Sequence, residues 1–291
     1  MKWPAVAVLA ALIGGSDAVA CESLLSEARA ARTDVSALRT IYVAAEDDCD
    51  LQATRRIGAA LAIALYRRAQ TESAEAAEQS LEEALKYDRR WQILSALGSI
   101  HSKRGHWEQA AIRYQEALLE IEQGNADATP SNEVIAALLR KANNARAAAP
   151  VYVRTLRTRA NKPGGIASER VGGLEIEVVP FPIEFRFRES TMTEKGRVAA
   201  LDLAEIIASQ SPARITLVGH TDPVGSDAFN DRLSLERAEA VRQFLYQQGI
   251  TSVQIAIEGR GERQPPDVDD PGQFSREELH QIYRRVELSR D

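Results

Sequence analysis

Two oppositely charged side chains stand 15 positions apart in residues 219–241, which read GHTDPVGSDAFNDRLSLERAEAV. Asp222 lies in a polar loop after a predicted strand, and Arg237 lies in the amphipathic helix that follows. A carboxylate can pair with an ammonium group, and a guanidinium presents a bidentate fork to a carboxylate. Asn230, between them, can hydrogen-bond to either group. These three residues predict a pocket for a ligand that carries both an ammonium and a carboxylate.

The elements that must position this pocket follow from the periodicity of the sequence. Residues 213–220 alternate and are rich in β-branched side chains, which predicts a strand, and residues 222–231 have the composition of a loop. We expect the next helix to begin at Ser234 as N-cap and to end at Gly249. Arg237 would then lie in its first turn, where free N–H groups and the helix dipole favour anions.

The rest of the second half predicts a mixed α/β arrangement, with helices packed on a sheet. The further elements expected are a helix at 194–209 and strands at 174–179, 183–188, 252–258 and 284–289.

An ordered set of residues in this half resembles the OmpA-like peptidoglycan-binding domain, over about residues 180–290. The motif T-D-x-x-G-x-x-x-x-N-x-x-L-S-x-x-R-A is matched by Thr221, Asp222, Gly225, Asn230, Leu233, Ser234, Arg237 and Ala238. Further matches are Gly259, Gly261, Glu262, Pro265 and the run Arg284, Arg285, Val286 and Glu287.

The resemblance implies a ligand, the diaminopimelate of the peptide stem of peptidoglycan, which carries an amine and a carboxylate on one carbon. It assigns the ammonium to Asp222, the carboxylate to Arg237 and a supporting contact to Asn230. The resemblance also implies that three further residues line or brace the pocket: Thr221, Leu233 and Arg285. Two departures from the family stand out: Tyr283 occupies a position that is often Asn, and residues 266–281 read PDVDDPGQFSREELHQ.

The first half of the chain is helical in pattern and contains a repeat. Ala77, Leu81 and Ala84 recur 33 positions later as Ala110, Tyr114 and Ala117. The copy at residues 91–118 resembles the tetratricopeptide repeat, whose period is about 34. In the earlier copy, Leu65 stands at the position equivalent to Gly98 and Glu72 at the position equivalent to Gly105. Residues 134–149 look like a capping helix. The alternative is an array of helical hairpins without repeat ancestry; either array suits protein or peptide binding.

The N-terminus predicts secretion. Residues 1–20 combine a Lys, an apolar run at 4–13 and an A-x-A pattern at 18–20, as in a signal peptide cut after Ala20. The alternatives are an uncleaved anchor or an ordinary buried helix. We expect a location in the periplasm or cell envelope, which includes the option of association with the outer membrane.

The chain has two cysteines, Cys21 and Cys49, and an even pair in an oxidising compartment predicts a disulfide. The alternatives are two free thiols or a lipidated Cys21, although Ala18 stands where that modification usually has Leu. Membrane association is expected only if Cys21 carries a lipid.

Charge and motifs narrow the function. The net charge of −6 argues against nucleic acid as a partner. The scattered histidines lack metal-ligand spacing, and the mature chain lacks a nucleophile motif, so we expect no enzyme, metal or cofactor.

The sequence predicts four parts: a signal peptide at 1–20, a tetratricopeptide-like domain at 21–160, a linker at 161–179 and an OmpA-like domain at 180–291. The favoured function is an anchor that ties a helical protein-interaction scaffold to peptidoglycan, with a protein partner on the repeats. The alternative is a scaffold that acts through its repeats and has a vestigial wall pocket.

Overall fold

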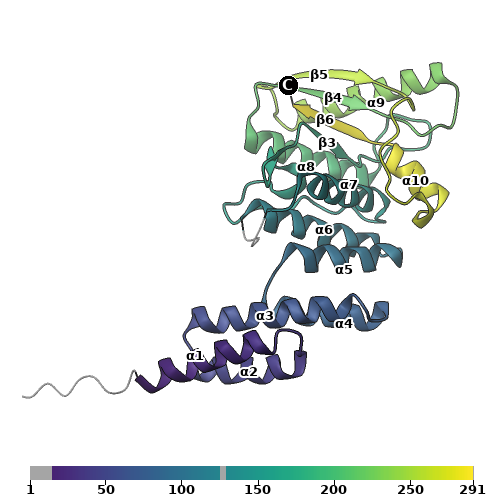
Figure 1. Cartoon of the computed structure of the whole chain (residues 1–291). Helices are drawn as coiled ribbons and strands as arrows, with labels where there is room; N and C mark the ends of the chain where they lie inside the picture. Colours follow the sequence, from purple (N-terminus) through teal and green to yellow (C-terminus); the bar gives the residue numbers. More distant parts are fainter. Residues whose placement is uncertain (1–14, 125–128, 291) are drawn as a thin grey trace, which may run out of the picture. The chain divides into compact units, whose positions relative to one another are not determined.

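The computed structural model describes residues 15–124 and 129–290 (Figure 1). The chain forms two compact units, which divide between Arg89 and Arg90. The compositional boundary expected near residue 160 therefore lies inside the second unit. Residues 1–14 of the expected signal peptide lie outside the described residues, and residues 15–20 begin the first helix.

The described part of the first unit consists of helices α1 (Gly15–Ala30), α2 (Val35–Asp48), α3 (Leu51–Ala69) and α4 (Ala74–Tyr87). Asp34, Asp50 and Ser73 cap α2, α3 and α4, because each side chain accepts a hydrogen bond from a free N–H of the first turn. The apolar side chains that these helices bury include Leu38, Ile57, Leu61, Leu65 and Leu81.

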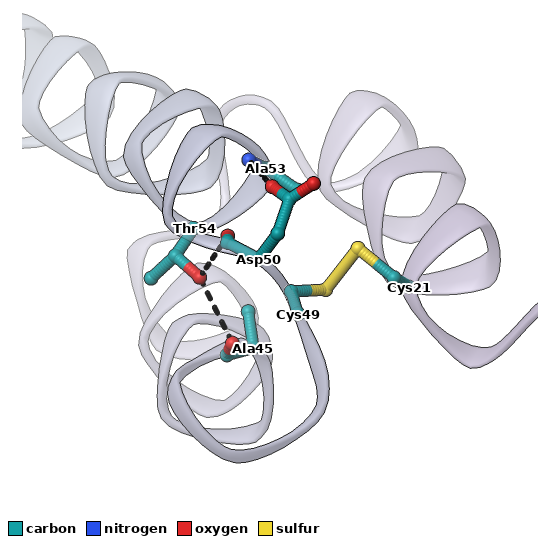
Figure 2. Close-up of a disulfide and its surroundings, with 6 residues drawn as sticks. All are labelled: Cys21, Ala45, Cys49, Asp50, Ala53 and Thr54. Atoms are coloured by element: carbon teal, nitrogen blue, oxygen red, sulfur yellow. Dashed lines mark hydrogen bonds between the residues drawn. A yellow bond between two sulfur atoms is a disulfide. The ribbon is translucent and has the colours of Figure 1, made fainter. Parts of the chain in front are cut away.

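A disulfide joins Cys21 of α1 to Cys49, which ends α2 (Figure 2). The turn beside it is hydrogen-bonded on both sides: Asp50 accepts from Ala53 N, and the Thr54 hydroxyl donates to the carbonyls of Ala45 and Asp50. The predicted pairing of the two cysteines is confirmed, and the Cys21 sulfur is engaged by Cys49 rather than by a lipid.

The second unit starts with the helical hairpin of α5 (Trp91–Lys103) and α6 (Trp107–Glu122), followed by α7 (Asn132–Ala148). The ring of Tyr114 lies against Gly98, where an added Cβ would stand 2.7 Å from Tyr114 Cε1. A small residue on one helix and a tyrosine on the other thus allow the close approach that the sequence predicted for this hairpin. The tetratricopeptide interpretation of the hairpins stays a prediction.

The segment expected to be a linker is packed against α6. It forms the 3₁₀ turn η1 (Gly165–Ala167) and the two short strands β1 (Arg170–Val171) and β2 (Leu174–Glu175). The Glu122 carboxylate accepts hydrogen bonds from Gly165 N at 2.6 Å and from Ser168 Oγ at 2.7 Å. Ile166 is fully buried, so this stretch belongs to the core of the unit.

A four-stranded sheet carries the C-terminal region, in the order β3-β6-β4-β5 (Figure 1). Its strands are β3 (Val178–Phe181), β4 (Arg214–Gly219), β5 (Gln254–Gly259) and β6 (Val286–Arg290). β4 and β5 are parallel, and β6 pairs antiparallel with β3 and β4. The helices are α8 (Glu194–Gln210), α9 (Asp227–Gln247) and α10 (Arg276–Tyr283), with the 3₁₀ turn η2 (Pro271–Gln273) before α10.

This arrangement confirms the predicted mixed sheet with packed helices and corrects three elements. The strand expected at 174–179 is divided into β2 and β3, which belong to different sheets. Residues 183–188 form no strand; Phe185 makes only an isolated bridge to Met192. Helix α9 begins at Asp227 instead of after Ser234, because Ser226 accepts from Phe229 N as the N-cap. Arg237 therefore lies well inside the helix and not in its first turn.

Helix α7 is joined to the sheet domain by a buried charged group. Arg146, with 0% exposure, lies 3.9 Å from Asp202 of α8, and Tyr152 bridges them with hydrogen bonds of 2.7 and 2.8 Å. The same guanidinium lies over the ring of Phe181 in β3. Breaking such a buried pair leaves an uncompensated charge, which is strongly destabilising. α7 is thus part of the sheet domain rather than a cap on a separate helical array.

Two glycines let helix α9 lie directly on the sheet. Gly219 and Gly259 are register partners at the ends of the parallel strands β4 and β5. A Cβ on Gly219 would stand 2.1 Å from Ser234 O, and one on Gly259 would stand 2.6 Å from Leu235 N. The Ser234 hydroxyl accepts from Gly261 N at 3.0 Å and completes the contact.

The helices within residues 15–124 and 129–290 lack the combination of length and apolarity needed to cross a bilayer.

Loss of the disulfide should loosen the first unit alone. The bond closes a segment with a sequence separation of 28, so the chain-entropy relation gives about 3–4 kcal/mol of stabilisation. We expect Cys49→Ser to speed amide hydrogen exchange in α2 and α3, measured by mass spectrometry, and to leave α8 and α9 unchanged as the internal control. Equal exchange of α2 in the variant and the parent would contradict this prediction.

Gly219→Ala should push α9 away from the strand ends. Because the clash is with backbone, we expect a loss of about 3 kcal/mol, the upper part of the usual range for overpacked cores. The measurement is chemical denaturation followed by circular dichroism. The matched control is Gly272→Ala, where the nearest atom would lie 3.4 Å away, and it should change stability little. A variant at Gly219 as stable as this control would refute the close-approach argument.

Candidate functional site

Asp222 follows β4 and is held by two donors. Its Oδ1 accepts from Val224 N at 2.9 Å, a turn that the chain makes locally. Its Oδ2 accepts from Arg284 Nη1 at 3.0 Å. Arg284 lies at the end of α10, just before β6, which is the neighbour of β4 in the sheet. With 9% exposure the residue is buried, so this carboxylate has one defined orientation in the described structure.

Arg237 projects from α9 into the same charged group. Its Nε donates to Glu189 O at 3.1 Å, and its guanidinium lies over the ring of Phe185 with 5.0 Å to the centroid. The residue is only 3% exposed. No described residue accepts a hydrogen bond from its two Nη atoms.

The charges around Arg237 act on its proton affinity. Its pKa is lowered to about 10, first by burial and then by the positive charge of Arg284, against the opposing charge of Asp222. Arg237 still carries its proton at neutral pH. Arg237 and Arg284 thus share a cluster with the carboxylates of Asp222 and Glu277, so that the positive and negative charges balance.

Asn230 and Thr221 brace the loop that carries Asp222. Asn230 is 1% exposed and donates from Nδ2 to Asp222 O at 3.4 Å. Thr221 donates its backbone N–H to Gly261 O at 2.9 Å, and its buried hydroxyl has no hydrogen-bond partner among the described residues. Leu233 is 5% exposed and belongs to the apolar side of α9. These three residues support the loop and the helix more than they line an open pocket.

Arg285 lies apart from this cluster. Its Nε donates to Glu287 Oε1 at 2.8 Å, and its Nη2 donates to Gln264 O at 3.0 Å. On the same carboxylate, Oε2 lies 3.2 Å from His220 Nε2. Burial raises the pKa of Glu287, but the nearby His220 and the charge of Arg285 outweigh it and lower the pKa to about 2. Arg285 therefore serves a buried ion pair and does not reach Asp222.

Arg284 is the site residue that the sequence reasoning missed. Arg284 lies before β6 and is the C-cap of α10, so the alternation of the strand does not extend to it. The contact of Arg284 with Asp222 joins residues 62 positions apart, and the pattern of either segment alone does not record it.

The cluster brings together residues from three separated segments: Asp222 after β4, Arg237 in α9 and Arg284 after α10. It places guanidinium donors and a carboxylate acceptor close together. Among the described residues, no three side chains of His, Cys, Asp or Glu gather as a metal site.

Comparisons with known proteins match the same region. Residues 184–278 match the OmpA family. Outer membrane protein A of Shimwellia blattae is 36% identical over 83 residues, which cover 28% of this chain and 34% of that protein. Outer membrane porin F of Pseudomonas fluorescens is 32% identical over 111 residues, which cover 38% and 32%. This chain thus spans about a third of the length of these relatives.

Among solved structures, the OmpA-like domain of FopA1 from Francisella tularensis is 24% identical, with a TM-score of 0.31, and covers 38% of this chain and 70% of that one. The family match contains Asp222, Asn230 and Arg237 and ends before Arg284. The C-terminal region of this chain, residues 184–278, is therefore an OmpA family domain.

Proposed function

We propose that this protein is a non-catalytic peptidoglycan-binding protein of the cell envelope. In this proposal the C-terminal domain holds the diaminopimelate of the peptide stem, with its ammonium on Asp222 and its carboxylate on Arg237. The single observation that carries the proposal is the burial of both side chains in one charged cluster, in which the Nη atoms of Arg237 have no hydrogen bond from described residues.

The geometry supports a zwitterion better than a simple anion. Arg237 offers two parallel N–H donors, which match the two oxygens of a carboxylate. Asp222 has lone pairs beyond the two hydrogen bonds it already accepts, and an ammonium can use them. Asn230 keeps the loop in place through the Asp222 carbonyl rather than through the ligand.

The affinity per site should be modest. Charge-assisted hydrogen bonds contribute about 1.5–3 kcal/mol each, so two or three of them correspond to weak binding of a free stem peptide. The cell wall presents many copies of the ligand, and rebinding then holds the protein at the wall. The helices of residues 15–89 are the proposed surface for a protein partner in this anchor.

Sedimentation of the full mature chain with insoluble peptidoglycan tests the site. We expect Asp222→Asn and Arg237→Gln each to weaken binding about ten- to a hundredfold, because each removes one charge-assisted contact. The matched control is Arg232→Gln on the same helix, since Arg232 has an exposed side chain that pairs with Glu236 and lies over the ring of Phe229. Thermal melts of all variants establish that they are folded.

If the wild type and both site variants sediment alike while folded, the site assignment is wrong. Peptidoglycan in which lysine replaces diaminopimelate provides the ligand control, because lysine lacks the second carboxylate. Equal binding to both kinds of wall would refute the assignment of Arg237 to that carboxylate.

A binding protein should leave the wall intact. We expect no soluble wall fragments after incubation of the protein with peptidoglycan, as measured by liquid chromatography. Release of muropeptides at a rate that depends on protein concentration would overturn the non-catalytic assignment.

A further inference from the structure

The segment 266–283, between β5 and β6, packs against the helices that precede the sheet. We call it the clamp segment. It contains η2 and α10, and α10 starts with a capping box in which Ser275 and Glu278 exchange hydrogen bonds. The clamp segment is the part of the sequence that departs from the family pattern, and it ends directly before Arg284.

Its central contact is aromatic. The ring of Phe274 stacks on that of Trp107 from α6, with 4.3 Å between centroids and 11° between planes. Trp107 is 3% exposed, and its indole N–H donates to the Glu278 carboxylate of α10. Both the apolar face and the polar edge of Trp107 are therefore used to hold the clamp segment.

Polar contacts extend this attachment along α5 and α7. Ser102 Oγ donates to Gln273 Oε1 at 3.0 Å. The Arg140 guanidinium lies 3.1 Å from Asp267 and 2.9 Å from Asp269. Asn144, which is 8% exposed, donates to the Asp267 carbonyl at 3.2 Å. Arg140 of α7 thus pairs with two carboxylates at the acidic start of the clamp segment.

The other end of the clamp segment reaches the site. Glu277 of α10 pairs with Arg284 Nη2, and Arg284 Nη1 donates to Asp222 Oδ2 at 3.0 Å. The Arg284 backbone N–H also donates to His280 O, so Arg284 is the C-cap of α10. The position of α10 therefore decides where the Arg284 guanidinium lies.

We propose that α5–α7 position the wall-binding site through the clamp segment, with Trp107 and Phe274 acting through Arg284 on Asp222. This inference rests on the proposed function. Arg284 holds Asp222 in one orientation, while Glu277 holds Arg284. A clamp segment in place therefore presents a preorganised site, and its release lets Arg284 and then Asp222 sample other orientations, which weakens binding.

A double-mutant cycle tests this positioning role in the full chain. We expect Phe274→Ala to weaken sedimentation with diaminopimelate-type peptidoglycan about three- to tenfold. In an Arg284→Gln background the same substitution should change binding less than twofold, because the residue through which it acts is gone. Trp107→Phe keeps an aromatic ring and removes the N–H contact together with part of the stacked ring area, and it should give a smaller change with the same dependence on Arg284.

The control is Tyr246→Ala, which truncates a 38% exposed aromatic residue of α9 away from the site. It should leave binding unchanged. If Phe274→Ala and Trp107→Phe, with melting temperatures near that of the wild type, bind like the wild type, the proposal is overturned. An equal loss of binding in the Arg284→Gln background overturns it as well, since the effect is then general destabilisation.

A readout without the wall separates this proposal from the proposed function. Nuclear magnetic resonance of arginine side chains reports how slowly a guanidinium rotates. We expect the Arg284 signal to show restricted rotation in the wild type and to lose it in Phe274→Ala. An unchanged Arg284 signal refutes the clamp. If instead the wild type fails to sediment with peptidoglycan, the proposed function fails, and the Arg284 signal alone decides whether α5–α7 position Arg284.

Discussion

The contact of helix α9 with the paired glycines Gly219 and Gly259 sets the geometry of the C-terminal domain. Ser234 lies so close to the ends of β4 and β5 that a single methyl group on either glycine would collide with backbone or with its hydroxyl. This closeness brings the Arg237 side of α9 beside the loop that carries Asp222. Without it, the two charges would be separated by the width of a side-chain layer, and the cluster would not form.

The cluster itself shows why its residues are buried instead of solvated. A buried guanidinium is costly unless its charge and donors find partners. Arg237 finds the Glu189 carbonyl, the face of Phe185 and the nearby charge of Asp222, yet its pKa is still lowered to about 10. Its terminal donors are left for a ligand. The fold has already ordered and desolvated these donors, so a ligand does not bear that cost when it binds.

The helices before the sheet are not all of one kind. α5–α7 share a core with the sheet, through Arg146 and Asp202 and through the stack of Trp107 on Phe274. The helices of residues 15–89 form a separate compact unit that carries the disulfide. The helical pattern of the sequence therefore includes two kinds of helices. Helices α5–α7 belong to the sheet domain, and α1–α4 form the unit for which we propose a protein partner.

Local and chemical features were determined by the sequence alone. The even pair of cysteines predicted the disulfide, the periodicity predicted α8, β4, β5 and β6 close to their observed bounds, and the motif singled out Asp222 and Arg237. These features depend on near neighbours or on residue type. The tertiary structure decided which arginine reaches Asp222, where α9 begins, and that α5–α7 join the sheet domain. Each of these depends on contacts between segments far apart in the chain, and a pattern within one segment carries no record of what packs against it.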